Sequence, residues 1–139
     1  MTLSMIVRLA GASLIVLSLF HAALWRALGW GREMHQLSPL TARVFAVHAF
    51  FVALVLMGLG LLSLGRPDLL LNPSELALLL SGGMVVFWTA RLVLQPLVFD
   101  RPMRVGWTRS LPLRVGVNVL WAGYVALYGA ILCRQLGWV

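Results

Sequence analysis

The stretch that decides the fold is residues 76–99, LALLLSGGMVVFWTARLVLQPLVF, a run of 24 residues with one charge. At about 1.5 Å per residue, a helix of this length crosses the roughly 30 Å hydrocarbon core of a bilayer. The one charge is Arg91, nine residues before Asp100, which puts it about 13 Å along the helix from that end. Because a charge at such depth is costly, it usually marks a functional site.

The composition of the whole chain agrees with a membrane location. Of its 139 residues, 61% are hydrophobic and 11% are charged, and the mean hydropathy is +0.95. An ordinary soluble domain would not show these values, so we expect an integral membrane protein. The N-terminal run is interpreted as a span and not as a cleaved signal peptide, because its helical pattern continues through HAALWRALGW at residues 21–30.

Four apolar runs are predicted to cross the membrane, at about residues 3–28, 44–65, 75–99 and 113–134. Short connections between them predict an all-α, antiparallel four-helix bundle that forms a single transmembrane domain over residues 1–139. The sequence Asn72-Pro73-Ser74-Glu75 is typical of a helix start. Pro96 is expected to kink the third span beside Gln95.

All eleven basic residues are arginines, and they give the chain a net charge of +7. Most of them flank the apolar runs, as membrane topology requires, so the expected partner is the lipid bilayer and not nucleic acid. One side carries Arg26, Arg32, Arg43, Arg101, Arg104, Arg109 and Arg114, and the other carries Arg8, Arg66 and Arg134. Seven against three predicts a bacterial inner (cytoplasmic) membrane protein with connections 29–42 and 101–113 in the cytoplasm and both termini in the periplasm. Tryptophans near the span ends fit interfacial belts: Trp25, Trp30, Trp107 and Trp138.

The polar residues of the third span share one helical face. Steps of three and four residues connect Ser81, Met84, Trp88, Arg91 and Gln95. Each of the other spans brings one polar group to about the depth of Gln95, counted from its nearest flanking arginine: His21, His48 and Asn118. The face of Asn118 continues through Trp121, Val125 and Tyr128. These positions predict a pocket in the cytoplasmic half of the bundle, with candidate ligand-binding residues Arg91, Gln95, His21, His48, Trp88 and Asn118.

The leading functional hypothesis is that this pocket binds a small amphipathic ligand, a quinone or a lipid. Arg91 and Gln95 would engage the head group, and His21 and His48 would hydrogen-bond it or relay protons, so a redox role is permitted. Alternatively, Arg91 extends to Asp100 or to a lipid phosphate. No catalytic residue and no class of enzyme is indicated.

Two other functions stay open. In the first, the polar groups only hold helices together within a non-catalytic accessory subunit of a larger membrane complex. In the second, His21 and His48 ligate haem for electron transfer, since imidazoles at equal depth on antiparallel helices suit bis-histidine ligation. Apart from this, no metal site is predicted. The spacings of His21, His35 and His48 match no metal motif, and a lone Cys133 excludes a cysteine site.

Small residues recur on the fourth span at spacings that permit close helix approach. Gly116, Gly123 and Ala130 are seven apart, and Ala122, Ala126 and Ala130 are four apart. This face is expected to mediate either homo-oligomerisation or packing inside the bundle.

At residues 43–64, RVFAVHAFFVALVLMGLGLLSL, and 87–101, FWTARLVLQPLVFDR, the chain resembles a group of small bacterial proteins with four spans. This resemblance implies an architecture and no activity. The chain is also similar to the MAPEG superfamily in its length, number of spans, placement of termini and basic cytoplasmic pocket. That family has an Asn and a Glu after an Arg and His stretch in its second span. Here His48 is followed by Ala-Phe-Phe-Val, so the similarity implies the architecture alone and not glutathione chemistry.

Overall fold

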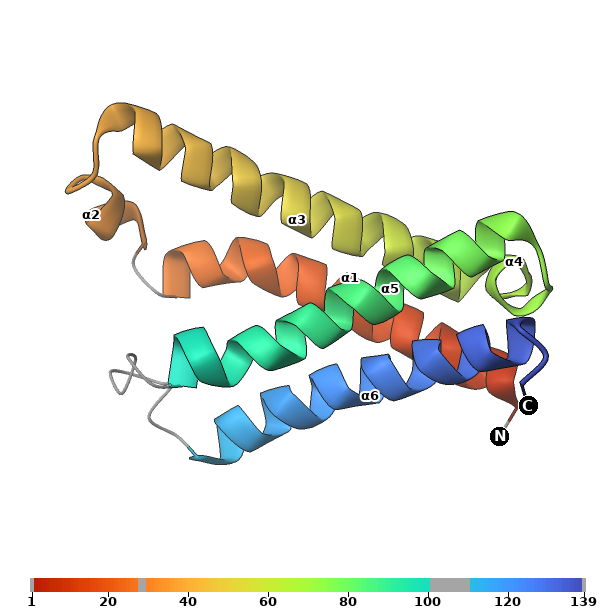
Figure 1. The fold of residues 1–139 in the computed structure, drawn as a ribbon. Coiled ribbons are helices and arrows are strands. Elements are labelled where there is room, and N and C mark those ends of the chain that lie inside the picture. Colours follow the sequence, from red (N-terminus) through yellow and green to blue (C-terminus); the bar gives the residue numbers. More distant parts are fainter. Residues whose placement is uncertain (1, 28–29, 101–110, 139) are drawn as a thin grey trace. The chain divides into compact units, whose positions relative to one another are not determined.

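The computed structural model of the chain describes residues 2–27, 30–100 and 111–138, and these residues form helices joined by short turns (Figure 1). The elements are α1 (Leu3–Ala27), α2 (Trp30–Met34), α3 (Pro39–Gly65), α4 (Asp68–Leu71), α5 (Glu75–Leu94), the π-helix η1 (Gln95–Asp100) and α6 (Leu111–Gln135). The predicted all-α class is confirmed for the described residues. The predicted basic connection with Arg101, Arg104, Trp107 and Arg109 lies outside the described residues, as do the side chains of Trp25, Arg26, Glu33 and Asp100.

Four helices in the described part of the chain are long and apolar enough to cross a membrane. The qualifying stretches are Leu3–His21, Pro39–Gly65, Glu75–Leu97 and Arg114–Gln135. Their number matches the four predicted spans. The chain divides into two compact units, unit 1 (Met1–Pro67) and unit 2 (Asp68–Val139), and each is described by itself.

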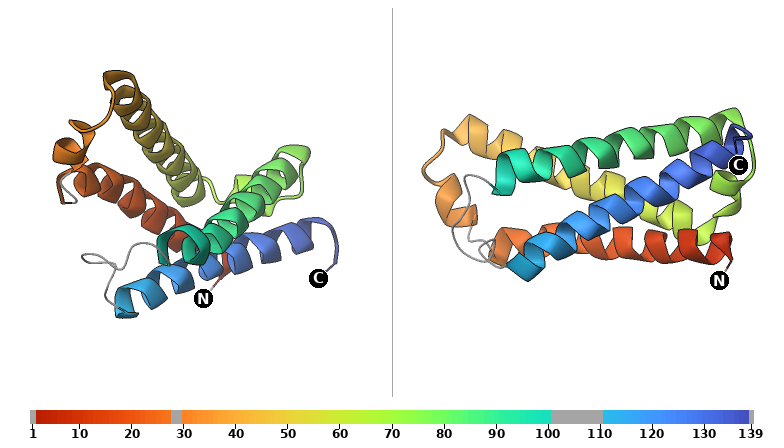
Figure 2. Two further views of the ribbon diagram at one scale, coloured as in Figure 1. Left: turned by 60° about the vertical axis from the view of Figure 1, so that its left-hand side comes forward. Right: turned by 60° about the horizontal axis from the view of Figure 1, so that its bottom comes forward.

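Unit 1 consists mainly of α1 and α3, which lie side by side and antiparallel (Figures 1 and 2). The buried positions on α1 follow steps of four and three residues, and so do those on α3. They are Val7, Gly11, Leu14 and Ser18 on α1, and Leu56, Gly60 and Ser63 on α3. An average spacing of 3.5 residues keeps one seam of each helix against its partner, as in a coiled coil.

The two backbones of unit 1 approach closely where Gly11 meets Gly60. A Cβ atom placed on Gly11 would lie 2.5 Å from the Leu64 nitrogen and 2.8 Å from the Gly60 carbonyl oxygen. A Cβ on Gly60 would lie 2.9 Å from the Gly11 carbonyl oxygen. Only glycine fits at these two positions, so the crossing point of the helices is determined by the absence of side chains.

Side chains of α1 donate two hydrogen bonds to backbone carbonyls of α3. The Ser18 hydroxyl donates to the Ala53 oxygen at 2.7 Å, and a guanidinium nitrogen of Arg8 donates to the Leu64 oxygen at 2.6 Å. The second bond satisfies a carbonyl in the last turn of α3, a position that cations favour. These contacts fix the antiparallel register of unit 1.

Unit 2 pairs α5 with α6 in antiparallel orientation, with α4 packed at one end. Both figures draw α5 (green) beside α6 (blue) (Figures 1 and 2). At the α4 end, the Gln135 side-chain nitrogen donates to the Leu70 carbonyl at 2.6 Å and to the Ser81 hydroxyl at 3.2 Å. Gln135 therefore connects α6 to both α4 and α5.

Several helix boundaries can be compared with the predictions. Ser74 caps α5, and its hydroxyl accepts from the Ala77 N–H at 3.1 Å, which confirms the predicted helix start. The end of α3 at Gly65 is also confirmed. However, α3 begins at Pro39 and not near Val44, because Ser38 caps the helix and Pro39 occupies its first position. The short helices α2 and α4 were not predicted.

The helix of unit 2 becomes irregular at the predicted place, but as a wider helix. From Gln95 to Asp100 the chain forms the π-helix η1, which includes Pro96. Proline has no N–H to donate to the carbonyl four residues earlier, and its ring crowds that carbonyl. A wider turn relieves this conflict, and such segments are frequent at functional sites.

Candidate functional site

The predicted polar face of α5 is the face that α5 buries. Ser81, Met84 and Trp88 are buried, and Gln95 is 9% exposed. Arg91 falls between Trp88 and Gln95 on the same face and is half-buried. The average spacing of 3.5 residues therefore predicted the buried face of α5 correctly. This face includes the guanidinium of Arg91 and the amide of Gln95.

Trp88 is the centre of an aromatic stack that joins α5 to α6. Its ring lies 5.0 Å from the Trp121 ring with 18° between the planes, and 4.4 Å from the Tyr124 ring with 27° between the planes. Phe87 meets Trp88 edge-on at 5.0 Å. Stacking of this kind stabilises a pair beyond the area it buries, by about 0.5–1.5 kcal/mol.

The Arg91 side chain extends across the helix pair to the Trp121 ring. Its guanidinium carbon lies 5.3 Å from the ring centroid, within the range of a cation–π interaction. The contact positions the cation beside the aromatic stack. The carboxylate of Asp100, the alternative partner considered from the sequence, lies outside the described residues.

Among the uncharged side chains of this region, three buried polar atoms have no hydrogen-bond partner in the described part of the chain. They are the indole nitrogens of Trp88 and Trp121 and the side-chain oxygen of Gln95. Leaving a buried donor or acceptor unmatched costs about 1–3 kcal/mol. A buried polar atom without a partner needs a physical explanation, and a bound ligand that completes the hydrogen bond is one such explanation.

Asn118 lies at the same end of unit 2. Arg91 contacts Trp121, and the two helices are antiparallel. Gln95, one turn after Arg91, is therefore level with residues 117 and 118, one turn before Trp121. The Asn118 amide donates to the Arg114 carbonyl of its own helix at 2.9 Å. We call these neighbours the polar-aromatic cluster: Trp88, Arg91, Gln95, Asn118, Trp121 and Tyr124.

Four members of the cluster were predicted site residues, namely Trp88, Arg91, Gln95 and Asn118. Trp121 was expected on the face of Asn118 but was not a candidate ligand-binding residue. Tyr124, which is buried against Trp88, was missed. The steps of three and four that connect Trp121, Tyr124 and Tyr128 are the signal that could have found it.

The two candidate histidines belong to unit 1. His21 continues the buried seam of α1 and is half-buried. Its Nδ1 lies 2.9 Å from the Leu17 carbonyl, and since a carbonyl only accepts, Nδ1 must carry the proton. His21 is thus held to its own helix by one ring nitrogen.

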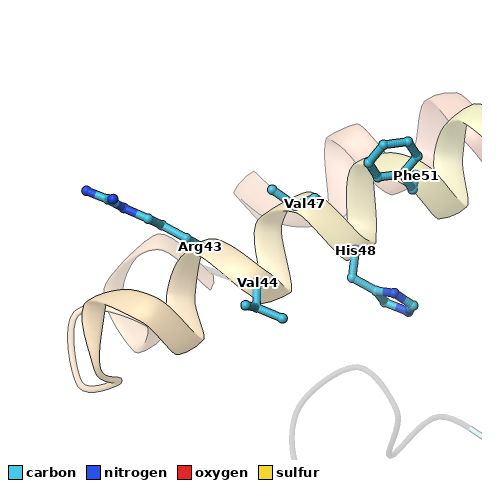
Figure 3. A pocket seen from close by; sticks show the side chains of 5 residues that line it. All are labelled: Arg43, Val44, Val47, His48 and Phe51. Carbon is cyan, nitrogen blue, oxygen red and sulfur yellow. The ribbon is translucent and has the colours of Figure 1, made fainter.

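His48 is exposed and lies on another face of α3. It is one residue from Ala49, so it is turned about 100° around the helix from that half-buried position. Figure 3 shows its ring projecting from α3 beside Val44, where it lines a shallow surface depression with Arg43, Val47 and Phe51. His48 therefore lies outside the buried seam of α3.

Other candidates are placed as follows. His35 is exposed, and Cys133 is a half-buried free thiol. Within residues 2–27, 30–100 and 111–138, no three His, Cys, Asp or Glu side chains gather as a metal site would need. The predicted layer of four polar groups draws on both units, so it stays a prediction.

The small residues of α6 do not form the α5–α6 interface. Gly116, Ala122, Gly123, Ala126 and Ala130 are all exposed. A Cβ atom on either glycine would meet nothing within 4 Å. This face is available for contact with another helix.

Comparisons with protein-family models, with curated proteins and with solved structures found no match to this chain. The functional argument therefore depends on the site alone.

Proposed function

We propose that the chain is a multi-pass membrane protein whose α1, α3, α5 and α6 cross the bilayer as an antiparallel bundle. The four helices of sufficient length and apolarity support this proposal. The asymmetry of the arginines supports a periplasmic location for both termini in a bacterial inner membrane. Reporter fusions are expected to find the C-terminus outside the cytoplasm, and a cytoplasmic C-terminus would overturn this orientation.

We further propose that the polar-aromatic cluster binds the head group of a small amphipathic ligand, a quinone or a lipid. The observation that carries this proposal is the buried Gln95 oxygen without a hydrogen-bond partner among the described residues, next to the Arg91–Trp121 contact. Burying an unmatched amide destabilises a protein, and a ligand that donates to it would offset the cost. In this arrangement Arg91 and Gln95 engage the head group.

The surroundings of the cluster suit an apolar tail. Val93, Leu94 and Leu97 follow Arg91 on α5 and η1, and each exposes about half of its side chain. A ligand held by its head group at Gln95 could therefore lay its tail along exposed apolar surface of the same helix.

The test is the ligand content of protein extracted with its surrounding lipid. The wild type is expected to retain a specific quinone or lipid detectable by mass spectrometry. Arg91→Ala should lose it, and Arg91→Lys should retain part of it, because an ammonium keeps the charge but not the planar fork of the guanidinium. Arg134→Ala, which alters an exposed arginine of α6, is the matched control. Equal, wild-type-like retention by both Arg91 variants would contradict the proposal.

A second candidate is a non-catalytic accessory subunit of a larger membrane complex or a homo-oligomer. The exposed small-residue face of α6 favours it, since glycine and alanine allow helices to approach closely. Replacing Gly123 and Ala126 with leucine should then disrupt crosslinking to a partner in membranes. Crosslinking that traps only the monomer, with wild type and variant alike, would remove this candidate.

A further inference from the structure

We propose that the head group bound by the cluster is an oxyanion that also carries a hydroxyl, as in a glycerophosphate, and not the neutral ring of a quinone. This inference rests on the proposed function and narrows it to one chemical class. The hydrogen-bonding groups that the cluster buries, and the charges around it, lead to this choice.

The cluster offers more donors than acceptors. An indole nitrogen only donates and a guanidinium only donates, whereas the oxygen of an amide only accepts. Among its uncharged side chains, the unmatched atoms are two indole N–H groups, on Trp88 and Trp121, and one acceptor, on Gln95. A complementary head group therefore has several accepting oxygens and at least one hydrogen to give.

The choice of tryptophan in the stack supports the use of its N–H groups. Trp88 is 1% exposed and Trp121 is 5% exposed. Phenylalanine would supply a stacking ring at both positions without burying a polar nitrogen. Two buried indoles in contact are costly unless their N–H groups meet an acceptor.

The charges around the cluster favour an anion. Arg91 and Arg114 both belong to this end of unit 2, where Asn118 bonds the Arg114 carbonyl. Guanidinium groups pair best with planar or tetrahedral oxyanions.

The acceptor on Gln95 adds a requirement. A carboxylate or a fully substituted phosphate diester has no hydrogen to donate, whereas a glycerol hydroxyl does. A head group with both a phosphate and a hydroxyl would satisfy the two indoles, Arg91 and Gln95 together. Phosphatidylglycerol in the bilayer and a free lysophosphatidate share this chemistry.

The experiment measures binding of four probes to the full-length protein in nanodiscs of neutral phosphatidylcholine. The probes are phosphatidylglycerol, 1-oleoyl lysophosphatidate, the same lysophosphatidate methylated at its free hydroxyl, and decylubiquinone. Binding is followed directly by native mass spectrometry, so that replacing tryptophan does not alter the readout. The variants are Trp88→Phe with Trp121→Phe, Gln95→Leu, Arg91→Ala, and Trp138→Phe as a matched control, since Trp138 is 75% exposed.

The expected result has three parts. One or both hydroxyl-bearing phosphates bind the wild type, and Arg91→Ala abolishes this binding. Removing both indole N–H groups weakens it by about tenfold or more, as expected for hydrogen bonds to a charged group, while Trp138→Phe does not. Methylating the hydroxyl weakens binding to the wild type but not to Gln95→Leu. Preference for phosphatidylglycerol or for lysophosphatidate identifies the bilayer or the free pool as the source.

Three other outcomes overturn the inference. Tighter, Arg91-dependent binding of decylubiquinone would leave the proposed function standing and remove the oxyanion. Phosphate binding that ignores both the double tryptophan variant and the hydroxyl would remove the assigned donors and acceptor. Failure of every probe to bind would contradict the proposed function as well, so the two failures can be told apart.

Discussion

The two units bury residues at the same helical spacing, but the buried side chains are small in unit 1 and large in unit 2. In unit 1 the seam between α1 and α3 contains Gly11, Ser18, Gly60 and Ser63, and the backbones themselves come into contact. In unit 2 the seam between α5 and α6 contains Trp88, and rings and polar tips fill the space between the helices. Helix separation follows the size of the side chains at the contact. A small-residue seam leaves no room for a ligand, whereas a seam of large amphipathic side chains can build a site.

The largest loss of stability should come from removing the central ring of the aromatic stack in unit 2. Trp88→Ala removes a fully buried ring that touches both Trp121 and Tyr124. We expect it to lower the free energy of unfolding by about 3–5 kcal/mol, measured as a large drop in the thermal midpoint. Phe87→Ala, at the partly exposed neighbouring position, should cost much less. Equal losses would mean that the stack is not the core of unit 2.

A smaller effect is expected from adding a side chain to unit 1. Gly60→Leu places a Cβ within 2.9 Å of the Gly11 carbonyl oxygen, so the helices must separate, at a cost of about 1–3 kcal/mol. Gly58→Leu is the control, because a Cβ there meets nothing within 4 Å. Thermal unfolding should distinguish the pair, while ligand content stays at the wild-type level in both. Indistinguishable midpoints would contradict the close approach at Gly60.

The α4 end of unit 2 depends on one amide. Gln135→Leu removes the donor to the Leu70 carbonyl and the Ser81 hydroxyl, and we expect a loss of about 1–2 kcal/mol. Hydrogen exchange should show faster opening of residues 68–71 in this variant. Arg134→Ala, one residue earlier and exposed, should leave that exchange unchanged. Protection that survives Gln135→Leu would show that α4 is held by its apolar contacts alone.

The smallest effect tests the polar contact within the small-residue seam. Ser18→Ala deletes the 2.7 Å hydrogen bond to the Ala53 carbonyl without adding volume. Interhelical hydrogen bonds in membranes contribute about 0.6 kcal/mol on average, so the midpoint should fall only slightly. A loss as large as that of Gly60→Leu would mean that this bond, and not close packing, holds α1 to α3.

The spacing of residues predicted which face of a helix is buried, but it did not predict which side chains meet across the interface between two helices. Steps of three and four placed Ser81, Trp88 and Gln95 on one face of α5, and that face is buried. Ser74 and its neighbours indicated the start of α5 because capping is a local interaction. The spacing could have placed Tyr124 on the buried face of α6 but not in contact with Trp88, since that contact depends on the register between two helices, and register is decided by how side chains fit across the interface.

The histidines show the limit of predictions made from depth. Counting residues from Arg43 gave the level of His48 along the helix but not its direction around the axis. His48 directly precedes the half-buried Ala49. Each step of one residue along a helix changes the direction of the side chain by about 100°. For Arg91 the spacing gave the direction, since it shares the buried face of Trp88.

Each unit is built from helices that follow one another along the chain, and this has a consequence for biosynthesis. Unit 1 ends at Pro67, so all its helices have been translated before the first residue of α5. Domains generally fold as units, starting from the N-terminus while synthesis continues. The glycine crossing of α1 and α3 can therefore form before Arg91 has been translated. When Arg91 is translated, the hairpin of α1 and α3 can already be assembled, whereas the Trp121 ring that Arg91 contacts is added only with α6.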